Sequence, residues 1–433
     1  MLFYSTNHLS PLVDFRQATL QGQPPDKGLY FPVDIPLMRI RNFSDIRLIP
    51  KEELLFEVIR PYVENTIPID QLRNIVTSAI NFDFPLQKVT RSIYSLELFH
   101  GPTLAFKDVG ARFLSRCLGY FKQSENRKTI VLVATSGDTG GAVANSFAGV
   151  EGIHTVILYP EGKVSEVQEL QLTTCGNNVT ALQVMGDFDE CQKLVKSAFS
   201  DTDLNNSISL TSANSINVAR WLPQQFYYLE ALRQWNETEL PCFSVPSGNF
   251  GNLTAGLLAI KSTGLQISFL AAMNSNTAVH DYLSTGRYEA RKTIPTISNA
   301  MDVGDPSNFS RILALFEKNY HEIKKHIHSY CISDDLTRNT IQRIFREEGY
   351  LLDPHGAVGF AALEKFISGN NCKGIFLETA HPIKFADLVE PLIKKAIEVP
   401  QIIKSLYART KSFTRISPVY ETVKELLMDL GKK

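Results

Sequence analysis

The central and C-terminal parts of the chain repeat one pattern, in which a short run of apolar residues precedes a longer amphipathic segment. The runs cover residues 129–135, 155–159, 179–184, 242–247, 267–273 and 374–379. They are largely continuous rather than alternating, which is typical of strands covered on both faces. Helical patterns follow them, for example after Ser165 and from Asp187. The pattern therefore predicts an α/β fold with mostly parallel sheets between layers of helices.

The apolar runs fall into two groups, before and after about residue 210, and this grouping predicts two doubly wound lobes. We expect a smaller lobe over residues 93–210 and a larger lobe over residues 211–433. Residues 1–92 differ because they are irregular and interrupted by proline and glycine, with helical patterns near 51–63 and 70–81. They predict a separate, mainly helical N-terminal domain.

Composition limits the classes of function. The chain has 433 residues, a formal net charge of -1, and apolar and charged fractions of 44% and 21%. These values predict a globular protein with a large core and no global field that attracts nucleic acid or an anionic membrane. No stretch approaches the ~20 apolar residues of a membrane span, and the cysteines and histidines lack a zinc-ligand spacing. We therefore expect a soluble, cytoplasmic protein without a bound metal.

Ligands of doubly wound sheets bind beyond the carboxyl ends of the strands, and one such end carries the segment Ser247–Asn252. Its small residues let backbone N–H groups approach an anion, and the helix that follows adds favourable charge at its N-terminus. The segment lacks the lysine of a Walker motif and the spacing of a dinucleotide fingerprint, which argues against a nucleotide. A phosphate-binding loop and a plain tight turn both fit these residues.

A second strand end, Thr135–Gly141, also leads into a helix. Its hydroxyl groups and free N–H groups are able to hold a carboxylate. The same residues equally fit a helix N-cap, with glycines that permit close packing of the helix on the sheet.

Lys107 follows an apolar Leu-Ala-Phe run and opens a helix. The positive end of the helix dipole disfavours a charged lysine there, and a lysine loses its charge readily when it is buried beside apolar groups. A neutral amine is what Schiff-base chemistry needs. The alternative is a surface lysine whose stem lies along apolar neighbours.

Two further segments carry polar residues near predicted strand or helix ends. Asn214 and Ser215 precede Arg220 near a helix start, and such a group is able to fix an anion through bidentate contacts. A Ser/Asn cap followed by a surface arginine is the alternative. Thr379 ends the last apolar run, where its hydroxyl is in a position to face a ligand.

Together these segments resemble the threonine synthases, in particular the longer kind found in many bacteria and fungi. The matching motifs, in family order, are FHGPTLAFKD, ATSGDTGGA, TSANSINVAR, VPSGNFGNLTAG, SNAMDVGDPSN, DPHGAVG and ETAHPIKF, and GLYFP near the N-terminus also matches. The resemblance covers essentially the whole chain. It implies pyridoxal 5'-phosphate as cofactor and the tryptophan-synthase-β fold, which is fold type II of the enzymes that use this cofactor.

The resemblance also implies a role for each candidate residue. Lys107 matches the Schiff-base lysine, and Thr379 matches the hydroxyl that faces the pyridine nitrogen of the cofactor. Asp138 matches a position near the phenolic oxygen of the ring, where many relatives have Asn, and the sequence leaves its protonation state open. The residues implied for the cofactor phosphate are Ser247, Gly248, Asn249, Phe250, Gly251 and Asn252. Those implied for the substrate carboxylate are Thr135, Ser136, Gly137 and Thr139, and those for the substrate phosphate are Asn214, Ser215 and Arg220.

The implied activity is the last step of threonine biosynthesis, in which O-phospho-L-homoserine and water give L-threonine and phosphate by γ-elimination and β-hydration. The main alternative is a phospho-lyase that uses the same cofactor and releases 2-oxobutyrate, because one scaffold supports several eliminations. A binding protein or an inactive paralogue is expected to lack Lys107 or the phosphate loop, and both are present. The motifs leave the choice between monomer and homodimer open.

Overall fold

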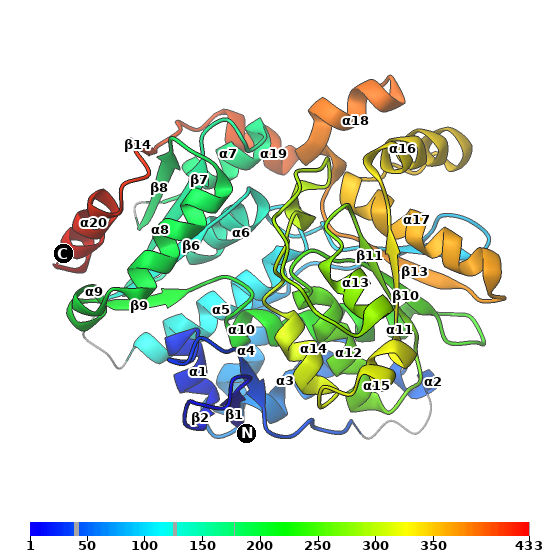
Figure 1. Cartoon of the computed structure of the whole chain (residues 1–433), viewed down its shortest axis with the longest axis horizontal. Helices are drawn as coiled ribbons and strands as arrows, with labels where there is room; N and C mark the ends of the chain where they lie inside the picture. The colour runs from blue at the N-terminus through cyan, green and yellow to red at the C-terminus, as the bar shows by residue number, and fades with distance from the viewer. Residues whose placement is uncertain (39–42, 124–127, 177, 433) are drawn as a thin grey trace.

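The fold consists of two α/β lobes with an N-terminal unit packed against them (Figure 1). The computed structural model describes residues 1–38, 43–123, 128–176 and 178–432. Each lobe contains one mainly parallel sheet between helices, so the predicted fold class is confirmed. The continuous apolar runs of the sequence form central strands because both faces of these strands are covered.

The larger sheet has six strands in the order β12-β11-β10-β13-β5-β4. Its strands are β4 (Leu86–Lys88), β5 (Ile93–Glu97), β10 (Cys242–Pro246), β11 (Phe269–Met273), β12 (Ile327–Cys331) and β13 (Gly374–Glu378). The pairs are parallel except that of β4 with β5. Helix α17 (Pro354–Gly369) packs on β10, β11 and β13. Because β10 and β13 are neighbours, the loop after Pro246 and the residue Thr379 leave the same edge of the sheet.

The smaller sheet has five parallel strands in the order β14-β8-β7-β6-β9. Its strands are β6 (Thr129–Ala134), β7 (Ile153–Pro160), β8 (Val179–Val184), β9 (Ser209–Ser212) and β14 (Thr414–Ile416). Its helices include α6 (Asp138–Phe147), α7 (Glu166–Thr173) and α8 (Phe188–Ser200). Since β6 and β9 are neighbours, the loops that begin at Thr135 and Ala213 also leave one edge together.

The two sheets cross the domain boundaries expected from the sequence. Strand β5 lies within residues 93–210 but pairs with β13 in the larger sheet. Strand β14 lies within residues 211–433 but pairs with β8 in the smaller sheet, and α20 (Tyr420–Lys432) packs on α8 beside it. Both strands are short and pair with segments far away in the sequence, which no local pattern indicates. The boundaries therefore divide the sequence but not the sheets.

The N-terminal unit is mainly helical, as predicted. Helices α3 (Lys51–Val63) and α4 (Ile69–Ala79) lie where the sequence predicted them. A small antiparallel sheet of β1 (Leu2–Ser5), β2 (Val13–Asp14) and β3 (Tyr30–Pro32) was not predicted, because its strands are only a few residues long. The apolar residues of this unit belong to the same buried cluster as those of the larger lobe.

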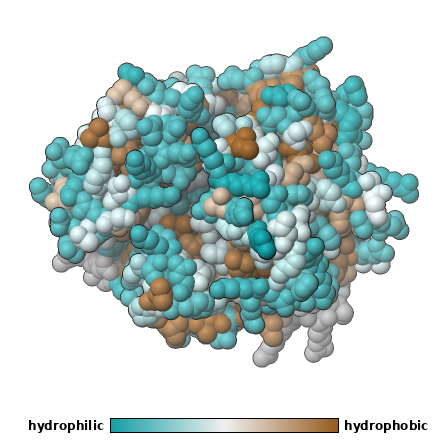
Figure 2. Space-filling model, in the orientation of Figure 1, coloured by the Kyte–Doolittle hydropathy of each residue, from teal (hydrophilic) through white to brown (hydrophobic). Residues whose placement is uncertain are grey.

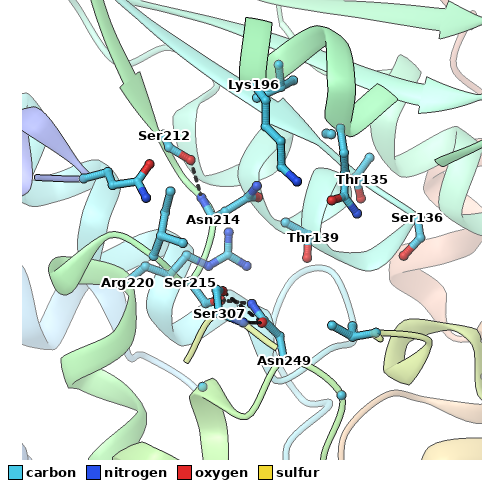
Figure 3. Close-up of a pocket in the computed structure, with 18 of the residues that line it drawn as sticks. Thr135, Ser136, Thr139, Lys196, Ser212, Asn214, Ser215, Arg220, Asn249 and Ser307 are labelled. Carbon is cyan, nitrogen blue, oxygen red and sulfur yellow. Dashed lines mark hydrogen bonds between the residues drawn. The ribbon is translucent and has the colours of Figure 1, made fainter. Parts of the chain in front are cut away.

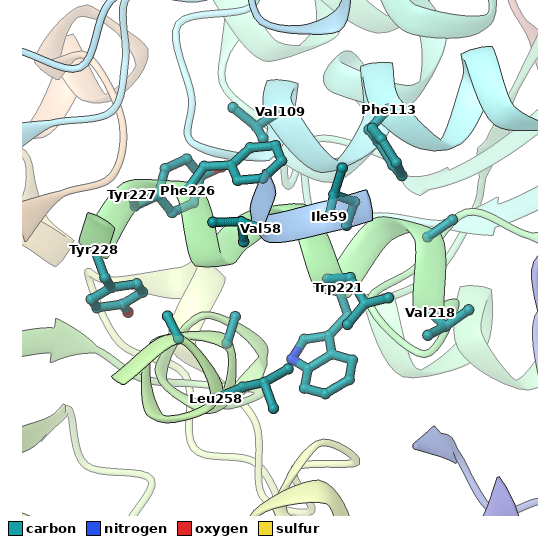
Figure 4. Packing of buried hydrophobic residues seen from close by; sticks show 14 of the residues in the cluster. Val58, Ile59, Val109, Phe113, Val218, Trp221, Phe226, Tyr227, Tyr228 and Leu258 are labelled. Atoms are coloured by element: carbon teal, nitrogen blue, oxygen red, sulfur yellow. The ribbon is translucent and has the colours of Figure 1, made fainter. Parts of the chain in front are cut away.

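That buried cluster fixes the helices that surround the cavity described below (Figure 4). It contains Trp221 and Tyr227, from α10 (Val218–Trp221) and α11 (Gln225–Gln234), and Phe113 of α5 (Lys107–Lys122). Burial of such a side chain stabilises the fold by roughly 2–3 kcal/mol. The packing therefore holds α5, whose first residue is the candidate lysine, in a rigid setting. No helix within the described parts of the chain is long and apolar enough to cross a membrane.

Candidate active site

A cavity of about 1220 Å³ lies between the lobes, at the carboxyl ends of β6, β10 and β13. The space-filling view shows a hollow with a mostly hydrophilic rim (Figure 2). Most of the residues predicted from separate motifs line it, namely Lys107, Thr135, Ser136, Asp138, Thr139, Asn214, Ser215, Arg220, Gly248, Asn249, Phe250, Gly251, Asn252 and Thr379. The other two predicted residues, Gly137 and Ser247, adjoin lining residues in the chain. The Ser247 hydroxyl donates to the carbonyl oxygen of Val245 at 2.8 Å instead.

Lys107 is a largely buried lysine at the start of α5. Its side chain is 14% exposed, and its Nζ lies 3.6 Å from Oδ2 of Asp138. Burial lowers the pKa of Lys107, and the charges of Lys384 and Arg220 lower it further, while Asp138 opposes the shift. A lysine in such a setting gives up its proton more readily than an exposed one, as a nucleophile or base must.

The loop before Lys107 is fixed from two sides. The N–H of Phe106 donates to the carbonyl oxygen of Thr379 at 2.9 Å, and the hydroxyl of Tyr227 donates to the carbonyl oxygen of Phe106. A bridge between Ala105 and Ala380 continues this contact. Lys107 and Thr379, which are far apart in the sequence, are therefore held on adjacent segments.

Asp138 begins α6 and is held as a carboxylate by two lysines. Its Oδ1 lies 2.8 Å from Nζ of Lys384 and accepts a hydrogen bond from Nε2 of Gln168 at 2.9 Å. Burial alone raises the pKa of Asp138, but the charges of Lys384 and Lys107 outweigh burial and hold the pKa below its ordinary value. The two lysines therefore favour the ionised form of Asp138, whose protonation state the sequence left open.

The loop between β10 and α12 (Gly251–Thr263) has the features of an anion site. Phe250 adopts the left-handed conformation, with φ 61°, just before the helix starts. A Cβ atom on Gly248 would lie 2.5 Å from Cα of Met301, so only glycine fits there. Nδ2 of Asn252 is buried and has no hydrogen-bond partner among the described residues, while its Oδ1 accepts from the Tyr228 hydroxyl at 2.8 Å. An unsatisfied buried donor at a helix N-terminus fits a phosphate-bearing cofactor.

Asn249 connects this loop to the loop after β9 (Figure 3). Its Nδ2 donates to the Ser215 hydroxyl at 3.0 Å, and its Oδ1 accepts from the backbone N–H of Ser307 at 2.7 Å. The sequence grouped Asn249 with the cofactor phosphate and Ser215 with the substrate phosphate. In the structure the two residues form one hydrogen-bonded cluster, because β9 and β10 bring their loops together across the cavity.

Two cations reach the cavity near this cluster (Figure 3). Arg220 is 4% exposed, and burial lowers its pKa to about 10, so it stays protonated at neutral pH. Lys196 extends into the cavity from α8 and has no hydrogen bond or ion pair with any described residue. Both cations lie where a ligand with more than one negative charge would balance them.

The loop after β6 forms the helix cap that its sequence allowed, and two of its hydroxyl residues line the cavity. The Thr135 hydroxyl accepts from the N–H groups of Gly137 at 2.9 Å and Gly140 at 2.8 Å, so it caps the start of α6. Gly137 has φ 134°, which favours glycine. The side chains of Ser136 and Thr139 line the cavity. Thr135 thus shapes the loop, and the hydroxyl groups of its neighbours are the ones available to a ligand.

The strand end at Thr379 is nearly buried, with Thr379 6% exposed. The preceding residue, Glu378, is fully buried, and burial together with the nearby Asp353 raises the pKa of Glu378 well above its ordinary value. Burial therefore favours the neutral form of this carboxyl group, and Thr379, the residue that follows β13, lines the cavity.

Sequence reasoning missed several residues of the site, namely Gln168, Lys196, Ser307 and Lys384. Lys384 and Ser307 lie within the motifs ETAHPIKF and SNAMDVGDPSN, so their presence in a motif was the available signal. Nothing in the immediate neighbours of Lys384 indicates burial, because the contacts that bury it come from distant segments. Lys196 lies on an amphipathic helix where a lysine is ordinary.

Comparison with known proteins assigns the chain to a family. The family described as pyridoxal-phosphate-dependent enzyme matches residues 82–374. The family model of the threonine synthase N terminus matches residues 2–80, and that of the C-terminal part of threonine synthase matches residues 356–427.

Individual threonine synthases are similar over almost the whole chain. That of Buchnera aphidicola subsp. Acyrthosiphon pisum is 40% identical over 433 residues, covering 99% of this chain and 100% of the relative. The solved threonine synthase from Escherichia coli has a TM-score of 0.92 and 37% identity, with coverage of 99% of this chain and 100% of that one. The pyridoxal-phosphate-bound threonine synthase from Brucella melitensis has a TM-score of 0.92 and 34% identity, with coverage of 100% of both chains. The chain therefore belongs to the pyridoxal-phosphate-dependent enzymes and, among them, to the threonine synthase family.

Proposed function

We propose that this chain converts O-phospho-L-homoserine and water to L-threonine and phosphate, with pyridoxal phosphate as its cofactor. The observation that carries the proposal is that one cavity brings a largely buried lysine together with two clusters suited to bind anions, which the hydrogen bond from Asn249 to Ser215 joins. One cluster is the start of α12 with the unpaired amide of Asn252, and the other contains Asn214, Ser215 and Arg220. A cofactor phosphate and a substrate phosphate require two such clusters near one lysine.

The cofactor would be held by Lys107, by the loop Ser247–Asn252 and by Thr379. When bound, pyridoxal phosphate withdraws electrons from the α-carbon of the substrate, so that the bonds around this carbon break more easily. The Thr379 hydroxyl would face the pyridine nitrogen as a neutral partner. Asp138 would lie beside the phenolic oxygen of the ring, where its two lysine neighbours offset its negative charge.

Lys107 would move the protons of the reaction. Its Nζ would take the proton from the α-carbon of the substrate and hold it for return at a later step. The neutral amine is the form that accepts a proton, and burial populates this form because it lowers the pKa of Lys107.

The two ends of the substrate would be bound by different loops. The hydroxyl groups of Ser136 and Thr139 would bind the carboxylate, on a loop whose shape is set by the hydrogen bonds from the N–H groups of Gly137 and Gly140 to Thr135. Asn214, Ser215 and Arg220 would bind the phosphate. Arg220 keeps its charge in this buried position and would stabilise the negative charge that grows on the departing phosphate.

The test is to incubate the cofactor-loaded protein with O-phospho-L-homoserine and to measure phosphate and the organic product together. Equal amounts of phosphate and threonine, abolished in Lys107→Ala but retained in the exposed-site control Lys128→Ala, are the expected result. Phosphate with 2-oxobutyrate would replace the proposed function by that of a lyase. No phosphate from a protein that shows no absorbance of bound cofactor would contradict both the function and the role of Lys107.

A further inference from the structure

Lys384 is a fully buried lysine that contacts a cavity-lining residue, Asp138, without lining the cavity itself. It belongs to the short helix η3 (Pro382–Phe385), which follows Thr379 at the end of β13. Its side chain is 0% exposed, and its Nζ lies 2.8 Å from Oδ1 of Asp138. The same Nζ donates to the carbonyl oxygen of Thr103 at 2.9 Å. Lys384 does not line the cavity, so it is not in a position to contact a ligand there.

Three charged groups therefore meet below the surface, because Asp138 pairs with Lys107 through one carboxylate oxygen and with Lys384 through the other. Removing an ion from water costs several kcal/mol, and an ion that loses its partner inside a protein is strongly destabilising. If Asp138 had Lys107 as its one partner, loss of the Lys107 proton would leave a buried carboxylate without a counter-ion. Asp138 would then hold that proton on Lys107.

Lys384 removes this obstacle because its contact with Asp138 does not depend on the state of Lys107. We propose that Lys384 is a positioning residue that stays paired with Asp138, so that Lys107 is able to give up its proton without leaving a buried carboxylate unpaired. This inference rests on the proposed function in one respect, namely that Lys107 must become neutral to work.

Other hydrogen bonds fix the position of Lys384 relative to Lys107 and Asp138. The Thr103 carbonyl oxygen that accepts from Lys384 also accepts from Nε2 of Gln171 at 3.0 Å. The backbone N–H of Thr103 donates to Asp108 at 2.8 Å, which ties this loop to the first turn of α5. Lys384 thus joins the loop before Lys107, the start of α6 and the end of β13.

The charged groups around Lys107 come from four elements. Asp138 of α6 favours the protonated form of Lys107, whereas Lys384 of η3 and Arg220 of α10 disfavour it. Asp108 follows Lys107 on α5, and its carboxyl is bound by Thr103. Removal of the Lys384 charge therefore has two effects. It takes away one of the two cations near Lys107, and it leaves Lys107 as the remaining lysine partner of Asp138. Both changes favour the protonated form of Lys107.

The test measures the titration of Lys107 directly in the full-length, cofactor-free protein. The rate at which an acetylating reagent modifies Lys107 is followed against pH by mass spectrometry in wild type, Lys384→Met and Lys384→Arg. We expect Lys107 to react about tenfold more slowly at neutral pH in Lys384→Met, which corresponds to one pKa unit, and at the wild-type rate in Lys384→Arg. The control is Lys261→Met, which removes another lysine that donates to a carbonyl oxygen, that of Leu315, outside the cavity.

A second readout uses the cofactor-loaded protein. The pH at which the absorbance of the bound cofactor changes is expected to move upward in Lys384→Met, with no such change in Lys261→Met. Unchanged titration of Lys107 in a folded Lys384→Met protein would overturn the proposal.

If Lys384→Met does not fold, Asp138→Asn carries the test, because without the carboxylate Lys107 must react faster than in wild type. An unchanged or slower reaction there would also overturn the proposal. The labelling needs no turnover, so failure of the proposed function and failure of this inference are distinguishable.

Discussion

Nζ of Lys107 and Oδ2 of Asp138 lie 3.6 Å apart, although the two residues begin different helices, α5 and α6. Both side chains are largely withdrawn from water, so the charge of each depends on the other. The carboxylate favours a charged Lys107, while burial favours a neutral one. The balance between these effects, with Lys384 paired to the other oxygen of the Asp138 carboxylate, sets how easily Lys107 exchanges a proton.

The first prediction concerns the stability of this buried pair. Asp138→Asn leaves Lys384 as a buried cation without a carboxylate partner, so we expect the free energy of unfolding at neutral pH to fall by about 3 kcal/mol. Denaturant unfolding measures this change. The double variant Asp138→Asn, Lys384→Met removes both charges and should recover part of the loss. A double variant less stable than Asp138→Asn alone would contradict the pairing.

The same substitution has a predictable pH dependence. The folded protein holds the pKa of Asp138 below its ordinary value, so its contribution to stability is present above that value and is lost as the pH falls. The stability difference between wild type and Asp138→Asn should therefore be full at neutral pH and should shrink below about pH 4, the ordinary pKa of an aspartate. A difference that grows in acid would reverse the assigned sign.

The sequence was sufficient for elements whose determinants are local. The run 179–184 coincides with β8, and Ser165 and Asp187 form the capping boxes that begin α7 and α8. It was not sufficient for β5 and β14, since their partners lie far away in the chain. The lobes therefore exchange strands in a way that hydrophobic periodicity does not predict.

The site likewise contains some features that the local sequence predicts and others that depend on the fold. The glycine-rich loop after β10 and the lysine at the start of α5 are local features, and both line the cavity. The partnership of Lys384 with Asp138 depends on the fold, because β13 must bring η3 next to α6. The roles that the family resemblance gives to individual residues remain proposals. The variants of Gly248 and Arg220 below test two of them, and the last variant tests Lys196, to which the resemblance gives no role.

Gly248→Ala tests the cofactor phosphate loop. The added Cβ would lie 2.5 Å from Cα of Met301, which is backbone and cannot rotate away. Such overpacking costs typically 1–3 kcal/mol, so we expect the dissociation constant of pyridoxal phosphate to rise about tenfold or more. Equilibrium titration of the cofactor-free protein measures this constant. Gly369→Ala is the control, because nothing lies within 4 Å of its Cβ position; equal affinities in the two variants would contradict the prediction.

Arg220→Lys tests the stabilisation of the departing phosphate. Lysine keeps the charge but loses the planar fork that binds two oxygens at once. We expect kcat/KM for O-phospho-L-homoserine to fall about 100-fold, or ~2.7 kcal/mol, with the absorbance of the bound cofactor unchanged. Arg233→Lys, at an ion pair with Glu230 outside the cavity lining, should keep wild-type kinetics. If Arg220→Lys also retains kcat/KM within about twofold, Arg220 does not bind the phosphate in the transition state.

Lys196→Met tests whether the unpaired cation of α8 contributes to substrate binding. Lys196 extends into the cavity and has no partner among the described residues, so a phosphorylated substrate is the anion available to it. A charge-assisted hydrogen bond contributes about 1.5–3 kcal/mol, so we expect KM to rise about tenfold or more. Because the contact is the same before and during the reaction, kcat should change little. The salt dependence of KM should also weaken, since one exposed charge is removed.

Lys193→Met, on the same helix but outside the cavity lining, is the matched control. A lower kcat with unchanged KM would instead mean that Lys196 acts on the transition state, and equal kinetics in both variants would show that its charge is not used.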